Sequence, residues 1–219
     1  MDYNSIPYTT VEVNPLTKKQ IAFSSDHKKV PIANINGNTV FNSADIIDKL
    51  KEFSSAEDSK KLFTADTEEW MKWSETKLAV LLYPNITRSF GESWDAFSYV
   101  SDVSSWNWLD RSSNRILGPL AMSFANSKIK AKYNIWDERK ELKELLVHWT
   151  DSIATNNKGV MNGNFLHGAH VTMPDLMVYG VLHSIEGFET FDTIMTENTA
   201  LKSWYDNVQQ AVKSDRACT

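Results

Sequence analysis

The chain has 219 residues, 42% of them hydrophobic, which is enough to bury a core as one large domain or as two small ones. Its net charge of −5 and pI of about 5.6 argue against a nucleic-acid partner, which requires clustered Lys and Arg. The sequence contains no signal peptide and no apolar run of membrane-spanning length, so the chain as written is expected to be soluble and cytoplasmic. The single cysteine, Cys218, is a poor catalytic thiol because chain ends usually fray.

The first 53 residues predict a small α/β unit. Asn36-Gly37-Asn38 favours a type I′ hairpin turn, and Ser43 is expected to cap a helix. The expected elements are a strand at 8–13, a short helix within 16–23, strands at 29–35 and 39–41, and a helix from about 44 to 53. This order matches the C-terminal part of a thioredoxin-like domain, whose opening strand and helix have no counterpart before Tyr8.

A polar stretch at 54–66 is interpreted as a helix-poor interdomain linker between a domain at 1–53 and an all-helical domain at 67–219. Helices are predicted at 66–83, 91–103, 112–132, 137–155, 173–186 and 198–213. Pro84 is expected to end the first of them.

The helix at 173–186 carries the strongest start signal in the chain. Thr172 and Asp175 predict a capping box, and Val171 and Leu176 predict the hydrophobic staple that accompanies it. The residues that follow are apolar on nearly every face, so this helix is expected to be enclosed by others. Taken alone, the stretch fits an ordinary core helix as well as the enclosed helix of the glutathione transferase superfamily.

Blocks in the same order along the whole chain resemble the membrane-associated prostaglandin E synthase type 2 family. In the first domain the resembling segments are residues 6–15, 23–25 and 29–32. In the second they are Trp73 and residues 84–88, 175–182, 186–187 and 204–205. The resemblance implies an incomplete thioredoxin-like N-terminal domain followed by an all-α glutathione transferase-like C-terminal domain.

The resemblance also implies a function. Members of the family are usually dimeric, bind glutathione and in some cases haem, and isomerise a prostaglandin endoperoxide, a lipid-like electrophile. Their catalytic Cys-x-x-Cys motif, and their membrane anchor where there is one, would lie before Met1. Two interpretations therefore stay open: a glutathione-dependent isomerase whose full-length form carries the cysteine, or a catalytically inactive binding or assembly module. No catalytic residue is assigned within these 219 residues.

Four residues are expected to remain from the family's glutathione site. Val30-Pro31 resembles the superfamily's Val-cis-Pro, where a strand backbone pairs with the cysteinyl group. Ser43 and Ala44 fall where the family has an acid and a serine that bind the γ-glutamyl end. The helix N-terminus can still attract a carboxylate, so weak glutathione binding is expected. No metal site is expected, because His167-x-x-His170 lies in a Gly-rich loop without a carboxylate partner in ligand spacing.

Overall fold

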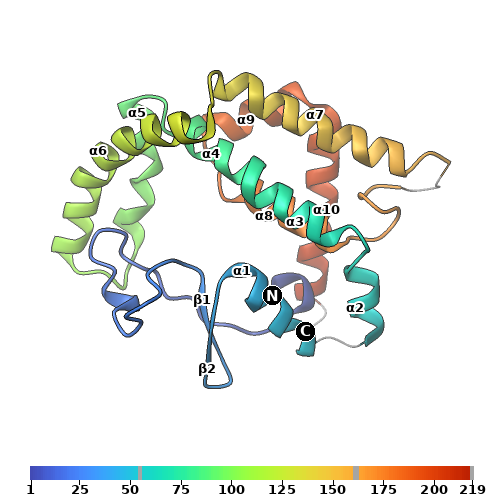
Figure 1. The fold of residues 1–219 in the computed structure, drawn as a ribbon, viewed down its shortest axis with the longest axis horizontal. Helices are drawn as coiled ribbons and strands as arrows, with labels where there is room; N and C mark the ends of the chain where they lie inside the picture. The colour runs from blue at the N-terminus through green and yellow to red at the C-terminus, as the bar shows by residue number, and fades with distance from the viewer. Residues whose placement is uncertain (54–55, 160–162, 218–219) are drawn as a thin grey trace.

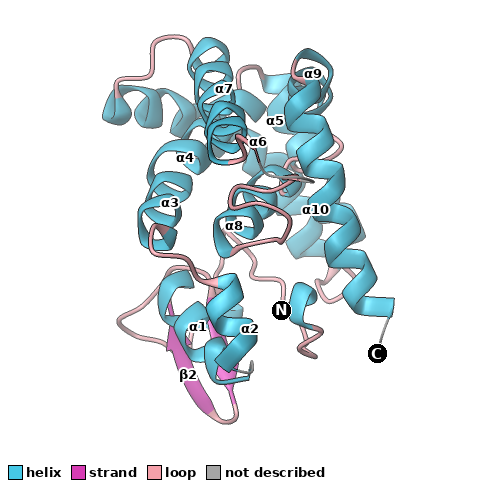
Figure 2. Cartoon of the chain, turned by 90° about the vertical axis from the view of Figure 1, so that its right-hand side faces the viewer, coloured by secondary structure: helices cyan, strands magenta, loops and turns pink. Residues whose placement is uncertain are grey.

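The computed structural model describes residues 1–53, 56–159 and 163–217. A hairpin and an irregular N-terminal segment lie on one side of a larger helical part (Figures 1 and 2). The first half contains β1 (Ile32–Ile35), β2 (Asn38–Phe41), α1 (Ser43–Leu50), α2 (Ala56–Leu62), α3 (Thr67–Trp73), the π-helical η4 (Ser74–Leu78), α4 (Ala79–Ile86) and α5 (Phe90–Ala96). The second half contains α6 (Trp108–Tyr133), α7 (Glu138–Asn156), α8 (Met173–His183), α9 (Glu189–Glu197) and α10 (Thr199–Ala217). Short 3-10 turns lie at Asp2–Asn4, Lys19–Ile21, Lys51–Phe53 and Ser98–Asp102.

The predicted hairpin is confirmed. β1 and β2 pair antiparallel, with Ile35 opposite Asn38, so the loop consists of Asn36 and Gly37 alone. Both loop residues have positive φ, 51° and 86°, as a type I′ turn requires. The Asn34 side chain accepts a hydrogen bond from the Gly37 N–H at 2.9 Å, which holds the turn closed.

The prediction of a strand at 8–13 is wrong. This segment has no strand hydrogen bonding in the structure, and the Tyr8 and Val11 side chains are exposed. The carbonyl of Glu12 instead accepts a hydrogen bond from the Trp106 indole at 3.2 Å. Among the described residues the sheet consists of β1 and β2, so the alternating pattern at 8–13 is not part of a sheet.

Three boundaries also differ from the predictions. Asn42 (φ 66°), not Ser43, is the N-cap of α1, and Ser43 is its first helical residue. The stretch predicted as a helix-poor linker holds α2, although its first residues, 54–55, lie outside the described part of the chain. Pro84 lies inside α4, which continues to Ile86. Helix α9 was not predicted, because its short amphipathic run follows α8 closely.

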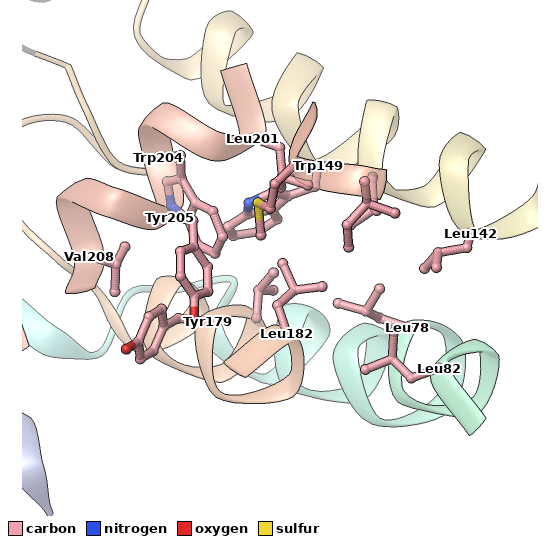
Figure 3. Packing of buried hydrophobic residues seen from close by; sticks show 14 of the residues in the cluster. Leu78, Leu82, Leu142, Trp149, Tyr179, Leu182, Leu201, Trp204, Tyr205 and Val208 are labelled. Carbon is pink, nitrogen blue, oxygen red and sulfur yellow. The ribbon is translucent and has the colours of Figure 1, made fainter. Parts of the chain in front are cut away.

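The partial α/β unit followed by a helical part is compatible with the predicted fold class. The main core lies in the helical part, where α8 packs against α3, η4 and α10. Trp149, Leu182 and Trp204, from three different helices, are between 0% and 2% exposed and meet at its centre (Figure 3). The rings of Trp149 and Trp204 pack edge to face with centroids 5.2 Å apart. Among the described residues, no helix is both long enough and apolar enough to cross a bilayer.

The capping box of α8 is confirmed, with Thr172 as N-cap and Asp175 at the third helical position. Val171 is 5% exposed and Leu176 packs against the core, as the staple predicts. The expectation that α8 is enclosed on every side holds for its first two turns only. Gly180 and His183 in its last turn are exposed.

Candidate functional site

The four predicted site residues lie at one end of the hairpin. Ile32, which follows Val30 and Pro31, pairs with Phe41, two positions before Ser43, the first residue of α1. The beginning of β1 and the N-terminus of α1 therefore lie side by side. The Val30-Pro31 peptide bond is cis, as predicted, and the Val30 side chain is 62% exposed.

Ser43 and Ala44 face the helical part of the molecule. The Ser43 hydroxyl donates to Oε1 of Glu75 at 2.8 Å, which joins α1 to η4. Ala44 lines a cavity of about 350 Å³ between α1 and the α3–η4 segment. The other residues that line this α1–η4 cavity are Ile47, Asp48, Lys51, Phe63, Thr64, Thr67, Glu68, Met71, Lys72 and Glu75.

Charges of both signs surround the α1–η4 cavity. Glu75 places a carboxylate at the N-terminus of α1, where the positive end of the helix dipole favours negative charge. Lys51 and Lys72 supply cations, and the Lys51 ammonium lies 4.1 Å from the centre of the Phe63 ring. Such a cavity suits a small zwitterion, because it offers partners for carboxylates and for an ammonium group. Among these charged residues, sequence reasoning missed Glu75, since it lies 32 positions after Ser43 and has no local signal.

Next to this cavity, hydrogen bonds through His167 connect the start of α3 to the start of α8. His167 contacts Asp66 Oδ2 through Nε2 at 3.0 Å and the Thr172 hydroxyl through Nδ1 at 3.1 Å. Burial acts to raise the pKa of Asp66, but hydrogen bonds from Thr64 and His167, with the charge on His167, hold that pKa below its ordinary value. His167 thus joins the N-caps of two helices.

A second, larger cavity of about 780 Å³ lies between α5 and the turn that joins α8 to α9. Its wall is acidic and aromatic, with Glu92, Asp95, Tyr99, Phe188 and Glu189 among its residues. Burial and the nearby charge of Glu12 raise the pKa of Tyr99. None of the four predicted site residues lines this cavity.

No known family model matches the chain. Among curated proteins, prostaglandin E synthase 2 of zebrafish (Danio rerio) is 27% identical over 258 aligned residues, and that of mouse (Mus musculus) is 25% identical over 260. The chain is similar to these proteins along nearly its whole length. Each alignment covers 97% of the chain, which spans 66% of the length of either relative. This similarity supports the family resemblance of the sequence blocks.

Proposed function

We propose that this chain is a prostaglandin E synthase 2-like protein of glutathione transferase type, whose full-length form isomerises a prostaglandin endoperoxide or a related electrophile with the help of glutathione. The observation that carries the proposal is the similarity to two proteins named prostaglandin E synthase 2 over 97% of the chain. The isomerisation breaks an O–O bond and forms a carbonyl and a hydroxyl without net oxidation, so the thiol is recovered after each turnover.

In this proposal the α1–η4 cavity and the adjoining start of β1 bind glutathione. The backbone of Val30, next to Pro31, pairs with the cysteinyl group, and the N-terminus of α1 at Ser43 and Ala44 receives the γ-glutamyl end. Ser43 stands where the family has an acid. Glu75 takes the place of that acid and binds the α-amino group of glutathione. Haem, where it is bound, occupies the same region together with glutathione.

A second candidate is a catalytically inactive binding or assembly module with the same fold. The specific observation in its favour is that the Ser43 hydroxyl is already bonded to Glu75 at 2.8 Å, so it is not free to bind a ligand carboxylate. The one cysteine of the sequence, Cys218, lies outside the described residues and outside the resemblance to the catalytic motif.

Calorimetric titration of the purified chain with glutathione, with and without haem, tests the proposal. Loss of binding in Ala44→Asp, which introduces a carboxylate at the helix start, would support the glutathione site, because Asp places a second negative charge beside the ligand carboxylate. Endoperoxide turnover by the full-length protein, measured next, separates the two candidates. A folded chain that does not bind glutathione contradicts the proposed site.

A further inference from the structure

A groove of about 770 Å³ lies between α7 and α9. Figures 1 and 2 both place these two helices at the end of the helical part that is far from the hairpin. This α7–α9 groove shares Glu189 with the cavity beside α5 and no lining residue with the α1–η4 cavity. A ligand in the groove would therefore bind apart from the proposed glutathione site.

The α7–α9 groove is cationic at one end. Four basic side chains line it near the first turns of α7, namely Arg88, Arg139, Lys140 and Lys143. Acidic side chains also line the groove. Glu189 lies at the start of α9, and Asp151 lies on α7 twelve positions after Arg139, which corresponds to about 18 Å along a helix. The excess of positive charge is therefore confined to the Arg139 end.

The floor of the groove between these ends is apolar. The residues that form it come from both helices and are Leu142, Leu146, Val147 and Ile194. Leu142, Leu146 and Ile194 also belong to the main core, whereas the Val147 side chain is 42% exposed. An apolar group that lies along the groove would remove the surface of Val147 from water.

Arg139 differs from the other arginine and from Lys143 at the cationic end. Arg88 donates to Glu92 at 2.6 Å, and Lys143 donates to Glu197 at 3.3 Å. The Arg139 guanidinium forms no hydrogen bond and no ion pair with another described residue, although its Nη1 is buried. Arg139 is thus the basic side chain of the groove that has donors to spare for a ligand.

The unpaired guanidinium is unfavourable for the fold. Burial, and next the like charge of Arg88, lower the pKa of Arg139. The charges of Glu92, Glu189 and Glu138 act in the opposite direction, but none of these carboxylates pairs with the guanidinium. A partly buried charge without an acceptor destabilises the chain, and an acceptor oxygen supplied from the groove would relieve the cost.

We propose that the α7–α9 groove binds an amphiphilic anion, in which a carboxylate head group contacts Arg139 and an apolar chain lies along the floor. The planar guanidinium matches the two oxygens of a carboxylate. Lys140, which is exposed beside Arg139, adds attraction for the head group. Asp151 repels a carboxylate from the far end of the groove, so the chain extends from Arg139 towards Thr150.

Calorimetric titration of the purified chain with decanoate tests the proposal. We expect one decanoate to bind, and Arg139→Gln to weaken binding at least about tenfold, as the loss of a charge-assisted contact implies. Lys202→Gln is the matched control, because it makes the same change of charge on the exposed surface of α10 and should bind like wild type. Glutathione affinity should be unchanged in both variants, so this test is distinguishable from that of the proposed function.

Two further comparisons separate the head group from the chain. Decan-1-ol lacks the charge, and butanoate lacks most of the chain, so each should bind at least about tenfold more weakly than decanoate. Val147→Glu introduces a carboxylate on the floor and should abolish decanoate binding. Leu120→Glu makes the same substitution at a comparably exposed position on α6, 45% exposed, and should bind decanoate like wild type.

Thermal unfolding distinguishes a ligand-binding role of Arg139 from a structural one. Removal of an unpaired, partly buried charge should leave the unfolding temperature of Arg139→Gln at or above that of wild type. Decanoate should raise the unfolding temperature of wild type but not that of Arg139→Gln. An Arg139→Gln variant that unfolds several degrees below wild type would show that Arg139 serves the fold and would overturn the proposal.

The binding experiments can overturn the proposal in other ways. Absence of decanoate binding to the wild-type chain at about 1 mM would do so, as would equal affinities of wild type and Arg139→Gln. Equal binding of decan-1-ol and decanoate would rule out recognition of the head group. Inorganic phosphate that binds at Arg139 as tightly as decanoate would rule out the contribution of the apolar floor.

Discussion

The indole N–H of Trp204 donates to Oδ1 of Asp175 at 2.9 Å, and both residues are almost completely buried. The same carboxylate accepts hydrogen bonds from the N–H of Leu166 and from the N–H and hydroxyl of Thr172. One side chain therefore joins the start of α8, the preceding loop and α10. The buried carboxylate is satisfied by its four hydrogen bonds. Each of the four donors in turn needs this carboxylate as its acceptor.

Replacing Asp175 by Ala should lower the free energy of unfolding by about 3–5 kcal/mol, because buried donors of Thr172, Leu166 and Trp204 lose their acceptor. Urea denaturation followed by tryptophan fluorescence measures the change. Asp206→Ala is the control, since Asp206 is exposed and pairs with Lys202 on the helix surface. It should cost less than about 1 kcal/mol, and an equal loss in both variants would contradict the role given to Asp175.

The pKa of Asp66 predicts a pH dependence of stability. Its pKa in the folded chain lies below the ordinary value of 3.8, because the hydrogen bonds from Thr64 and His167 and the His167 charge outweigh burial. The unfolded chain therefore binds a proton at Asp66 before the folded chain does as the pH falls. The stabilisation is complete above the unfolded pKa and is lost as the pH falls through the folded pKa.

Asp66→Asn keeps the size of the side chain and removes this titration. We expect the variant to be less stable than wild type at pH 7 and at pH 5, and the difference to shrink progressively towards pH 3. Urea unfolding at each pH measures it. The control is Glu57→Gln, an exposed partner of Lys61, which should follow the wild-type profile. A difference between wild type and Asp66→Asn that stays constant with pH would show that titration of Asp66 does not contribute to the stability.

Elements with strong local signals were predictable from the sequence. The Asn36-Gly37 turn fixes the hairpin register, because both residues tolerate positive φ. Thr172 and Asp175 fix the start of α8 in the same way, since a capping box is made within four residues. The long helices α6 and α7 were predicted from their helical sequence pattern, with boundaries that differ by a few residues.

Features that depend on distant contacts were not predictable. Residues 8–13 have the pattern of a strand, but one of them, Glu12, bonds through its carbonyl to the indole of Trp106, nearly a hundred positions later. The hydrogen bond between Glu75 and Ser43 at the start of α1 forms because η4 packs next to α1 in the fold. The bond of His167 to Asp66 likewise joins residues 101 positions apart, which no sequence spacing relates.

Two helical glycines should respond in opposite directions to alanine. A Cβ at Gly118 would lie 2.2–2.7 Å from ring atoms of Phe97, whereas one at Gly180 would meet nothing within 4 Å. Gly118→Ala should destabilise the chain by about 1–3 kcal/mol through overpacking. Gly180→Ala should stabilise it by about 0.5–1 kcal/mol through helix propensity. Thermal unfolding measures both, and Phe97→Leu should relieve part of the Gly118→Ala penalty if the ring is the cause.

The carboxylate of Glu75 provides the most direct test of the proposed glutathione site. If Glu75 binds the α-amino group of the γ-glutamyl end, Glu75→Gln should weaken glutathione binding about tenfold, which corresponds to about 1.4 kcal/mol for a lost charge-assisted contact. Calorimetric titration measures the affinity of both proteins. Glu69→Gln is the matched control, because Glu69 is exposed on α3 and does not line the α1–η4 cavity.

A glutathione analogue without the α-amino group separates this role from a structural one. The analogue should bind wild type and Glu75→Gln with the same affinity, because it lacks the group that Glu75 is proposed to contact. If Glu75→Gln instead binds glutathione more tightly, the carboxylate competes with the ligand for the N-terminus of α1. If the substitution weakens glutathione and analogue equally, Glu75 acts only by holding Ser43 and η4 together.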